Sequence, residues 1–237
     1  MELAFPVSQN GMQSALLTQV LIAQNLANLS TPGYKAARAF GGTFRIPGTQ
    51  IVETSPAMTP GPMRQTDRQL DLAIVGEGFF VVRAGGRRAF TRAGNFRVDE
   101  DGTIVTPAGF PLEGNIQVPP EATGIAVTTE GQIIATFEDG TGQALGQLEI
   151  ARFPNPAGLL PAGDNVYVEG PDSGDAILLT PGDQGSGYIQ QGFLEQSNVD
   201  EATEITNQIV NQRRFQVNLR TFQVMNEMLG KTVDLSG

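Results

Sequence analysis

The sequence contains no cysteine and no histidine among its 237 residues. Thiol nucleophiles, disulfides, zinc–thiolate sites and imidazole bases are therefore excluded. No run of about 18 apolar residues is present, so no membrane-spanning helix is expected. Positive charge is scarce as well: the chain has 15 Lys and Arg residues but 25 Asp and Glu residues, which gives a net charge of −10. This balance argues against a nucleic-acid-binding surface and against a polybasic membrane anchor.

The amino-terminal stretch MELAFPVSQNGMQSALL has neither a basic segment nor an uninterrupted apolar core. We therefore expect no cleavable signal peptide there. Hydrophobic residues make up 40% of the chain and charged residues 17%, which is typical of a globular protein. The 29 glycines and 15 prolines predict many turns, and hence short strands through the middle of the chain.

Residues 8–29 are predicted to form a helix. Residues recur at alternating spacings of three and four, the pattern of a helix that packs against another helix. Leu17, Val20 and Leu21 widen the apolar face, so this helix needs more than one neighbour. The helix is expected to stop near Pro32, which disfavours helical geometry at the residue before it, and Gly33, which permits a turn. The spaced residues are Met12, Ala15, Gln19, Ile22, Leu26 and Leu29, with Leu16 on the widened face.

Residues 36–70 carry Gly and Pro with little periodicity, which predicts an extended connector that can include short strands. Residues 71–190 alternate short β-rich runs with turns, as in a small sandwich or barrel-like domain. One hairpin is predicted around Gly85 and Gly86, and another around residues 99–102.

A second helix is predicted over residues 199–233, with Ser197 or Asn198 as its N-cap. Arg213, Arg214 and Arg220 lie between its apolar residues, as expected for a polar helix face. A two-helix pair cannot cover both wide apolar faces, so copies of the same chain are the expected cover. The apolar stripe comprises Ile205, Ile209, Phe215, Leu219, Phe222, Met225 and Leu229.

The predicted fold class is therefore α+β. Discontinuous terminal helices form a coiled-coil-like α-domain, with an all-β middle domain inserted between them and an extended connector. The predicted boundaries are residues 1–33 plus 197–237 for the helical domain, 34–70 for the connector and 71–196 for the β-domain.

Several possible sites have simpler explanations. VGEGFF lacks the third glycine of a dinucleotide fingerprint and is not followed by a crossover helix. DEDG at 99–102 lacks the ligand spacing of a calcium loop and fits a hairpin turn. The acid pairs Glu149 with Asp164 and Asp172 with Asp175 have nothing in the sequence to bring them together. We therefore expect no enzyme activity, no catalytic residue, no cofactor and no metal.

Four segments together resemble the bacterial flagellar rod and hook proteins. They are AQNLANLSTPGYKAARAF, LDLAIVGEGFFVV with the β-rich run after it, IARFPNPAGLLPAGDNVYVE, and the carboxy-terminal stretch that starts at GFLEQSNV. The resemblance spans nearly the whole chain in the correct order. The motif residues that carry it are Asn25, Asn28, Thr31, Pro32, Gly33, Tyr34, Lys35, Gly76, Gly78, Phe79, Phe80, Gly192, Ser197, Asn198 and Val199.

This resemblance implies a structural subunit of the flagellar rod that transmits torque and polymerises through its terminal helices. The implied partners are copies of itself, other rod and hook proteins, the surrounding ring proteins and the type III export apparatus, in a rod that crosses the periplasm. A distal rod protein is favoured slightly over a proximal one, although the short connector is more similar to the proximal type. The alternative is a monomeric β-domain binding module with a helical stalk.

The resemblance also places the exit of the chain from the helical wall at Pro32 and Gly33. Gly33→Val is therefore expected to weaken assembly while the β-domain melts at its normal temperature.

Overall fold

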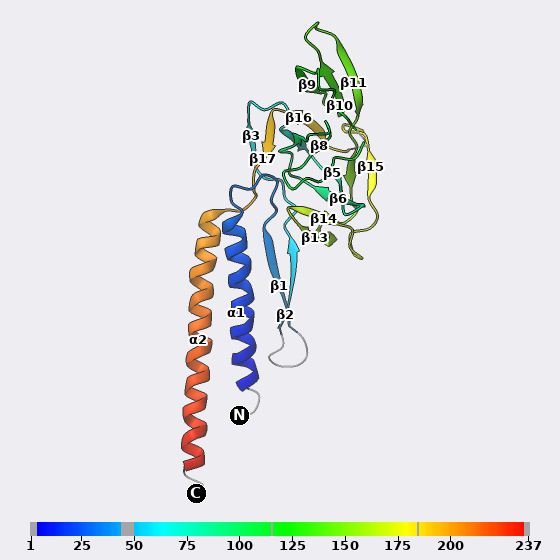
Figure 1. The fold of residues 1–237 in the computed structure, drawn as a ribbon. Helices are drawn as coiled ribbons and strands as arrows, with labels where there is room; N and C mark the ends of the chain where they lie inside the picture. Colours follow the sequence, from blue (N-terminus) through cyan, green and yellow to red (C-terminus); the bar gives the residue numbers. More distant parts are fainter. Residues whose placement is uncertain (1–3, 44–49, 115, 184, 235–237) are drawn as a thin grey trace. The chain divides into compact units, whose positions relative to one another are not determined.

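The computed structural model describes residues 4–43, 50–114, 116–183 and 185–234. A helix lies near each end of the chain and strands fill its middle, which confirms the α+β class (Figure 1). The chain divides into two compact units. The helical unit comprises residues 1–29, 37–55 and 199–237, and the β unit comprises residues 30–36 and 56–198.

The helical unit contains α1 (Ala4–Ala27) and α2 (Glu201–Asp234). Asp200 caps α2: its Oδ1 accepts from Ala202 N at 3.2 Å, and its Oδ2 accepts from Thr203 Oγ1. The predicted cap at Ser197 or Asn198 is therefore wrong by two or three residues. The carboxylate also suits this end of the helix because it faces the positive end of the helix dipole.

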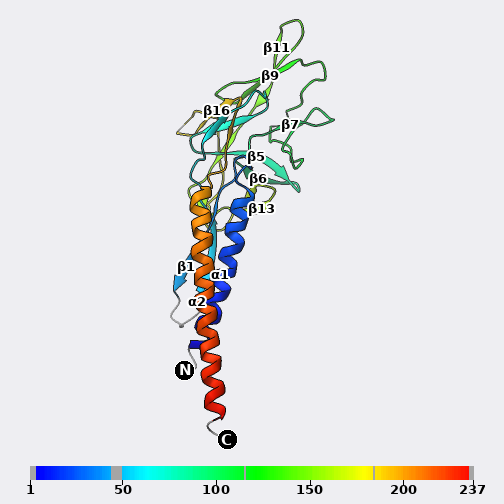
Figure 2. The ribbon, with the colours of Figure 1, turned by 90° about the vertical axis from the view of Figure 1, so that its left-hand side faces the viewer.

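The two helices lie side by side in both views (Figures 1 and 2). Asn211 of α2 is 5% exposed and donates to Ala15 O at 2.8 Å and to Gln19 Oε1 at 3.1 Å. At Gly11 the helices approach so closely that an added Cβ would lie 2.6 Å from Asn218 Nδ2. Residues at spacings of four and three cover the face of α2 that meets α1, and most of them are polar. They are Glu204, Gln208, Asn211, Phe215, Asn218, Phe222 and Met225, all buried or half-buried. The apolar coiled-coil seam expected from the sequence is not confirmed.

The helical unit also contains β1 (Ala37–Thr43) and β2 (Gln50–Pro56), which form a two-stranded sheet. The extended connector expected over residues 34–70 is not confirmed either. Residues 37–55 group with the helices, whereas residues 34–36 and 56–70 group with the β unit. Short strands were expected in this segment, but the sparse hydrophobic periodicity gave neither their bounds nor their pairing, because a narrow two-stranded sheet needs little apolar surface.

The β unit holds a six-stranded sheet in the order β13-β14-β6-β5-β12-β15, a three-stranded sheet β11-β10-β9, and three two-stranded sheets, β16-β4, β17-β3 and β7-β8. Its described strands thus form several small antiparallel sheets rather than a single sandwich or barrel. Their bounds are β3 (Met63–Gln65), β4 (Leu72–Val75), β5 (Phe79–Ala84), β6 (Arg87–Thr91), β7 (Arg97–Val98), β8 (Ile104–Val105), β9 (Gly124–Val127), β10 (Gln132–Thr136), β11 (Gly142–Gln147), β12 (Ile150–Arg152), β13 (Leu160–Gly163), β14 (Val166–Val168), β15 (Ile177–Leu179), β16 (Tyr188–Gln191) and β17 (Phe193–Glu195), with a 3-10 turn at Pro156–Gly158.

Both predicted hairpins are present. β5 and β6 pair with Ala84 opposite Arg87, and the two turn glycines, Gly85 and Gly86, have φ values of 58° and 78°. Positive φ at both central positions gives the tight turn that suits the twist of a hairpin. β7 and β8 pair across the turn at residues 99–102.

The core of the β unit lies on both faces of β5. Phe80 is 0% exposed and packs with Phe96 and Ile133 in one apolar cluster. Phe79 is 3% exposed and packs with Phe153 and Tyr167 in a second cluster. Successive side chains of a strand point to opposite faces of the sheet, so the adjacent Phe79 and Phe80 pack into two different apolar clusters. The β unit therefore forms two apolar cores within a single copy of the chain.

Candidate functional site

Glu195, at the end of β17, is the centre of a buried polar site and is itself 1% exposed. Its Oε1 accepts from Lys35 Nζ at 2.5 Å and from Gly61 N at 2.9 Å. Its Oε2 accepts from Arg92 Nη1 at 3.3 Å. One buried carboxylate thus joins three segments that lie far apart in the sequence, and we call these residues the Glu195 junction.

The two cations of the junction are also held by backbone carbonyls. Lys35 Nζ donates to Thr59 O at 2.9 Å, and Arg92 Nη2 donates to Gly76 O at 2.8 Å. Burial lowers the pKa of Lys35 and that of Arg92, and the nearby Glu195 carboxylate partly opposes this effect for both. Breaking such a pair on one side leaves a buried charge without compensation, which is strongly destabilising.

The residues that follow α1 belong to this junction. Gly33 N donates to the backbone oxygen of Glu195 at 2.7 Å, and Pro32 O accepts from Asn165 Nδ2 at 2.8 Å. Gly33 has a φ of 67°, and a Cβ added there would lie 2.4 Å from both Ala93 N and Arg92 C. The exit from the helix is therefore built into the β unit, so Gly33→Val should damage the β unit itself. This changes the expectation that the substitution would spare its folding.

Two asparagines of the family motif bind backbone within their own units. Asn198, in the β unit, accepts from Ala36 N at 2.7 Å and donates to Ala57 O at 2.7 Å. Asn25, in the helical unit, accepts from Ala37 N at 2.9 Å and donates to Ala37 O at 3.0 Å. Where the chain changes direction, some backbone N–H and C=O groups have no backbone partner. Each asparagine side chain forms hydrogen bonds with such groups and so stabilises the turn.

The other motif residues have structural positions. Asn28 donates to Gln24 O at 2.9 Å at the end of α1, and Tyr34 N donates to Thr31 O at 3.3 Å. Gly76, Gly78 and Gly192 have φ values of 114°, 137° and 75°, which favour glycine. Ser197 is buried and Val199 is half-buried, at the boundary between the β unit and α2.

The residues predicted for assembly fall on different helix faces. In α1, Ala15 and Ile22 are 6% and 4% exposed, whereas Leu16 is 57% exposed. In α2, Ile205, Ile209 and Leu219 are 44%, 49% and 37% exposed. Half-buried positions are Met12, Leu26, Leu29, Phe215, Phe222 and Met225. The placement of the Leu229 side chain lies outside the described residues.

The other candidate sites are accounted for. Asp99 Oδ1 accepts from Asp101 N at 3.1 Å and from Thr103 N at 2.7 Å, so its carboxylate closes the β7–β8 turn. Among the described residues no cluster of three or more Asp, Glu, His or Cys side chains is placed to hold a metal ion. Within the same residues, no helix combines the length and apolarity needed to cross a bilayer. Arg213, Arg214 and Arg220 are exposed.

Sequence reasoning missed Glu195 and Arg92. Glu195 lies inside the quoted motif GFLEQSNV, but a glutamate is rarely fully buried unless it is paired, and the sequence did not show its partners. Arg92 follows the second strand of the predicted hairpin and carried no signal of its own.

Two regions of the sequence match models of known protein families. Residues 73–135 match the model of the flagellar hook protein FlgE/F/G D1 domain, and residues 190–235 match that of the flagellar basal body rod FlgEFG protein C-terminal region. The flagellar basal-body rod protein FlgG of Buchnera aphidicola (subspecies Acyrthosiphon pisum) is 35% identical, over 97% of this chain and 98% of that protein. The chain belongs to the flagellar basal-body rod proteins.

Further relatives favour the FlgG type. The FlgG proteins of Agrobacterium fabrum and Bacillus subtilis are 36% and 34% identical, each over 95% of this chain and 96% of their own length. The FlgF protein of Caulobacter vibrioides is 28% identical over 91% of this chain. The chain is therefore a structural subunit of the flagellar basal body, not an enzyme, and it resembles FlgG more than FlgF.

Proposed function

We propose that this chain is a subunit of the distal flagellar rod and that it polymerises through the outward faces of α1 and α2. The supporting observation is apolar surface left open on the outward side of a helix pair whose contact face on α2 is mostly polar. Leu16, Leu17 and Val20 of α1 are 57%, 49% and 63% exposed. Val210, Val217 and Val224 of α2 are 42%, 62% and 48% exposed.

Charge supports the same proposal. No charged residue occurs between Leu3 and Tyr34, so α1 carries exposed leucines and valines without the charges that usually accompany a surface helix. An apolar face of this kind gains stability when it is covered, and apolar burial contributes about 25 cal/mol per Å². Copies of the chain supply such a cover in a helical polymer, because each copy presents the same two helices.

The helical assembly domain in this proposal is the predicted one, residues 1–33 and 197–237, except that residues 30–33 and 197–198 group with the β unit. Residues 71–196 form the β-domain, and the predicted connector, residues 34–70, is divided between the two units. The Glu195 junction holds residues 30–36 in place within the β unit. Transmission of torque from motor to hook requires rigid connections within each subunit. Rod and hook proteins and the surrounding ring proteins are the expected neighbours. Export through the flagellar type III apparatus is the proposed route into the periplasm.

The test is a charge placed on the outward face. Val217→Asp is expected to abolish concentration-dependent self-association, measured by sedimentation and by electron microscopy, while the β unit unfolds at its normal temperature. Asn207→Asp is the matched control because it adds the same charge at another exposed position of α2, and it should assemble normally. A wild-type chain that stays monomeric at every concentration would contradict the proposal and favour the monomeric binding module.

A further inference from the structure

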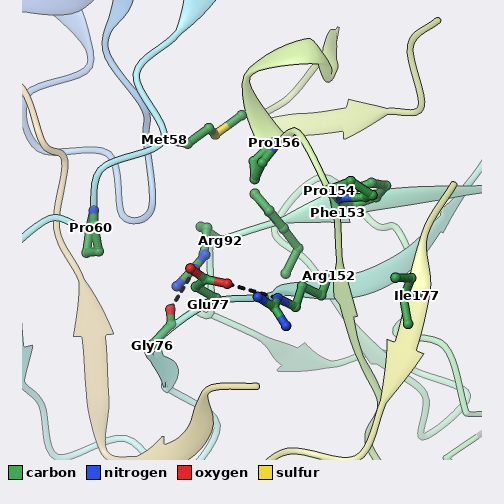
Figure 3. Close-up of a pocket in the computed structure, with 12 residues that line it drawn as sticks. Met58, Pro60, Gly76, Glu77, Arg92, Arg152, Phe153, Pro154, Pro156 and Ile177 are labelled. Carbon is green, nitrogen blue, oxygen red and sulfur yellow. Dashed lines mark hydrogen bonds and ion pairs between the residues drawn. The ribbon is translucent and has the colours of Figure 1, made fainter. Parts of the chain in front are cut away.

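A cleft of about 670 Å³ opens in the β unit beside the Glu195 junction (Figure 3). Its walls are mostly apolar, and its lining includes Met58, Phe79, Phe153, Pro154, Pro156 and Ile177. Ile177 belongs to β15, the last strand of the six-stranded sheet, and is 50% exposed. The cleft therefore offers a concave apolar surface at a sheet edge, a place where proteins commonly receive an extended or turning segment.

The cleft also carries a surplus of positive charge. Arg92 and Arg152 line it together with a single carboxylate, Glu77. Arg152 Nε lies 2.9 Å from Glu77 Oε2, and these two side chains are 42% and 70% exposed at the rim (Figure 3). Below them the Glu195 carboxylate is shared between Arg92 and Lys35. Two buried cations thus share one buried anion, in a chain whose net charge is −10.

Arg92 adds a second indication that something binds here. It is 6% exposed, its Nε has no hydrogen-bond partner among the described residues, and its guanidinium lies 5.3 Å from the centre of the Phe79 ring. An arginine beside an aromatic ring in an apolar cleft suits a ligand that combines an apolar side chain with a carboxylate.

The β10–β11 turn of the same chain has this chemistry. Phe137, Glu138 and Asp139 place one aromatic ring next to two carboxylates. The turn is already shaped, because Gly140 N donates to Phe137 O at 3.0 Å and Asp139 Oδ1 accepts from Thr141 N at 2.9 Å. Glu138 and Asp139 are exposed, and Figure 1 shows the hairpin at one end of the β unit. A preformed turn loses little conformational freedom when it binds.

We propose that this cleft receives the Phe137–Asp139 turn of a second copy of the chain, with Arg152 facing the turn's carboxylates. The inference rests on the proposed function in taking another copy as the occupant, but it concerns a contact between β units rather than between helices. Cleft and turn are different surfaces, so the contact is heterologous. Such contacts generate rings, or open helical assemblies when the rotation does not close.

Single cysteines test the contact in the full chain, because the sequence contains none of its own. Glu138→Cys and Ile177→Cys are prepared as separate proteins, mixed, and treated with a short bis-maleimide; Ile177 lines the cleft and is 50% exposed, so Arg152 is kept. Glu100→Cys is the matched control, since Glu100 is an exposed acid on the other acidic hairpin turn, between β7 and β8. The Glu138 and Ile177 variants should cross-link to each other about tenfold faster than the Glu100 and Ile177 variants, because a specific contact raises the local concentration of the second thiol.

Charge exchange provides the second measurement. Arg152→Glu should weaken self-association of the full chain. When the Arg152→Glu variant is mixed with the Glu138→Arg variant, the two should bind each other, because the exchanged charges are again opposite. Equal cross-linking of the test and control pairs in a chain that still self-associates would overturn this inference and leave the proposed function standing. A chain with no self-association at any concentration would overturn both.

Discussion

The two units of this protein satisfy their side chains in opposite ways. The β unit buries two apolar clusters, and it buries three charged side chains in the Glu195 junction, where each cation has a partner. The helical unit places asparagine and glutamine where its two helices meet and leaves valine and leucine exposed. The first arrangement is that of a domain complete in one copy. The second becomes complete only when its outward faces are covered, which is what a polymer subunit requires.

Gly33→Val should give the largest effect on the β unit. The substitution combines a left-handed backbone conformation with a Cβ placed 2.4 Å from backbone atoms of Arg92 and Ala93. We expect the free energy of unfolding to fall by roughly 4 kcal/mol or more, measured by denaturant titration. Gly85→Val separates the two causes, because Gly85 has a φ of 58° with nothing within 4 Å of the added atom. Its loss should be about 1–2 kcal/mol. Equal losses would show that the close packing around Gly33 is unimportant.

Glu195→Gln should come next. It leaves Lys35 and Arg92 buried without their carboxylate, and we expect a loss of about 3 kcal/mol in the unfolding free energy. Glu77→Gln is the control, because it breaks the exposed pair with Arg152, which should contribute at most about 1 kcal/mol. Similar losses for the two variants would mean that the Glu195 junction does not stabilise the β unit.

Asn211→Ala tests the helical unit. It removes the hydrogen bonds to Ala15 O and Gln19 Oε1, at an expected cost of about 1 kcal/mol in the stability of the helix pair. The measurement is helix content followed by circular dichroism during heating. Asn207→Ala, at an exposed position, should leave the melting of the helices unchanged. Identical melting curves for both variants would count against a polar seam between α1 and α2.

The smallest effect concerns a turn of the β unit. Hydrogen bonds from Thr141 hold the pKa of Asp139 below its ordinary value of 3.8. Because the folded pKa is lower than the unfolded one, the turn is stabilised above the unfolded pKa, and this contribution is lost as the pH falls through the folded pKa. An NMR titration should show the low pKa, and Thr141→Val should raise it. An unchanged titration midpoint would contradict this account of the turn.

Much of this organisation follows from the sequence. The spacing of Met12, Ala15, Ile22 and Leu26 identifies the face of α1 that meets α2, because apolar periodicity reports burial. On α2 hydrophobic periodicity is less informative. The inner face carries Phe215, Phe222 and Met225 of the predicted stripe, but the polar Gln208, Asn211 and Asn218 lie between them. Ile205 and Ile209 of the same stripe are exposed.

The hairpins were predictable and the Glu195 junction was not. Gly85 and Gly86 fix a local turn, and local geometry can be read from neighbouring residues. Glu195 gains its role from Lys35 and Arg92, which are brought to it only by the completed fold. The spacing of residues along the sequence does not reveal which distant residues such a buried glutamate will contact.

Amide hydrogen exchange on the full chain, first dilute and then assembled, tests the central claim most directly. Peptides from β5 and β6 should be strongly protected in both states, because one copy completes their core. Peptides from α1 and from residues 205–225 should exchange quickly in the dilute chain and slow by about 100-fold on assembly. Protection of α2 equal to that of β5 in the dilute monomer would show that the helical unit is complete by itself, and the proposed division between the two units would be wrong.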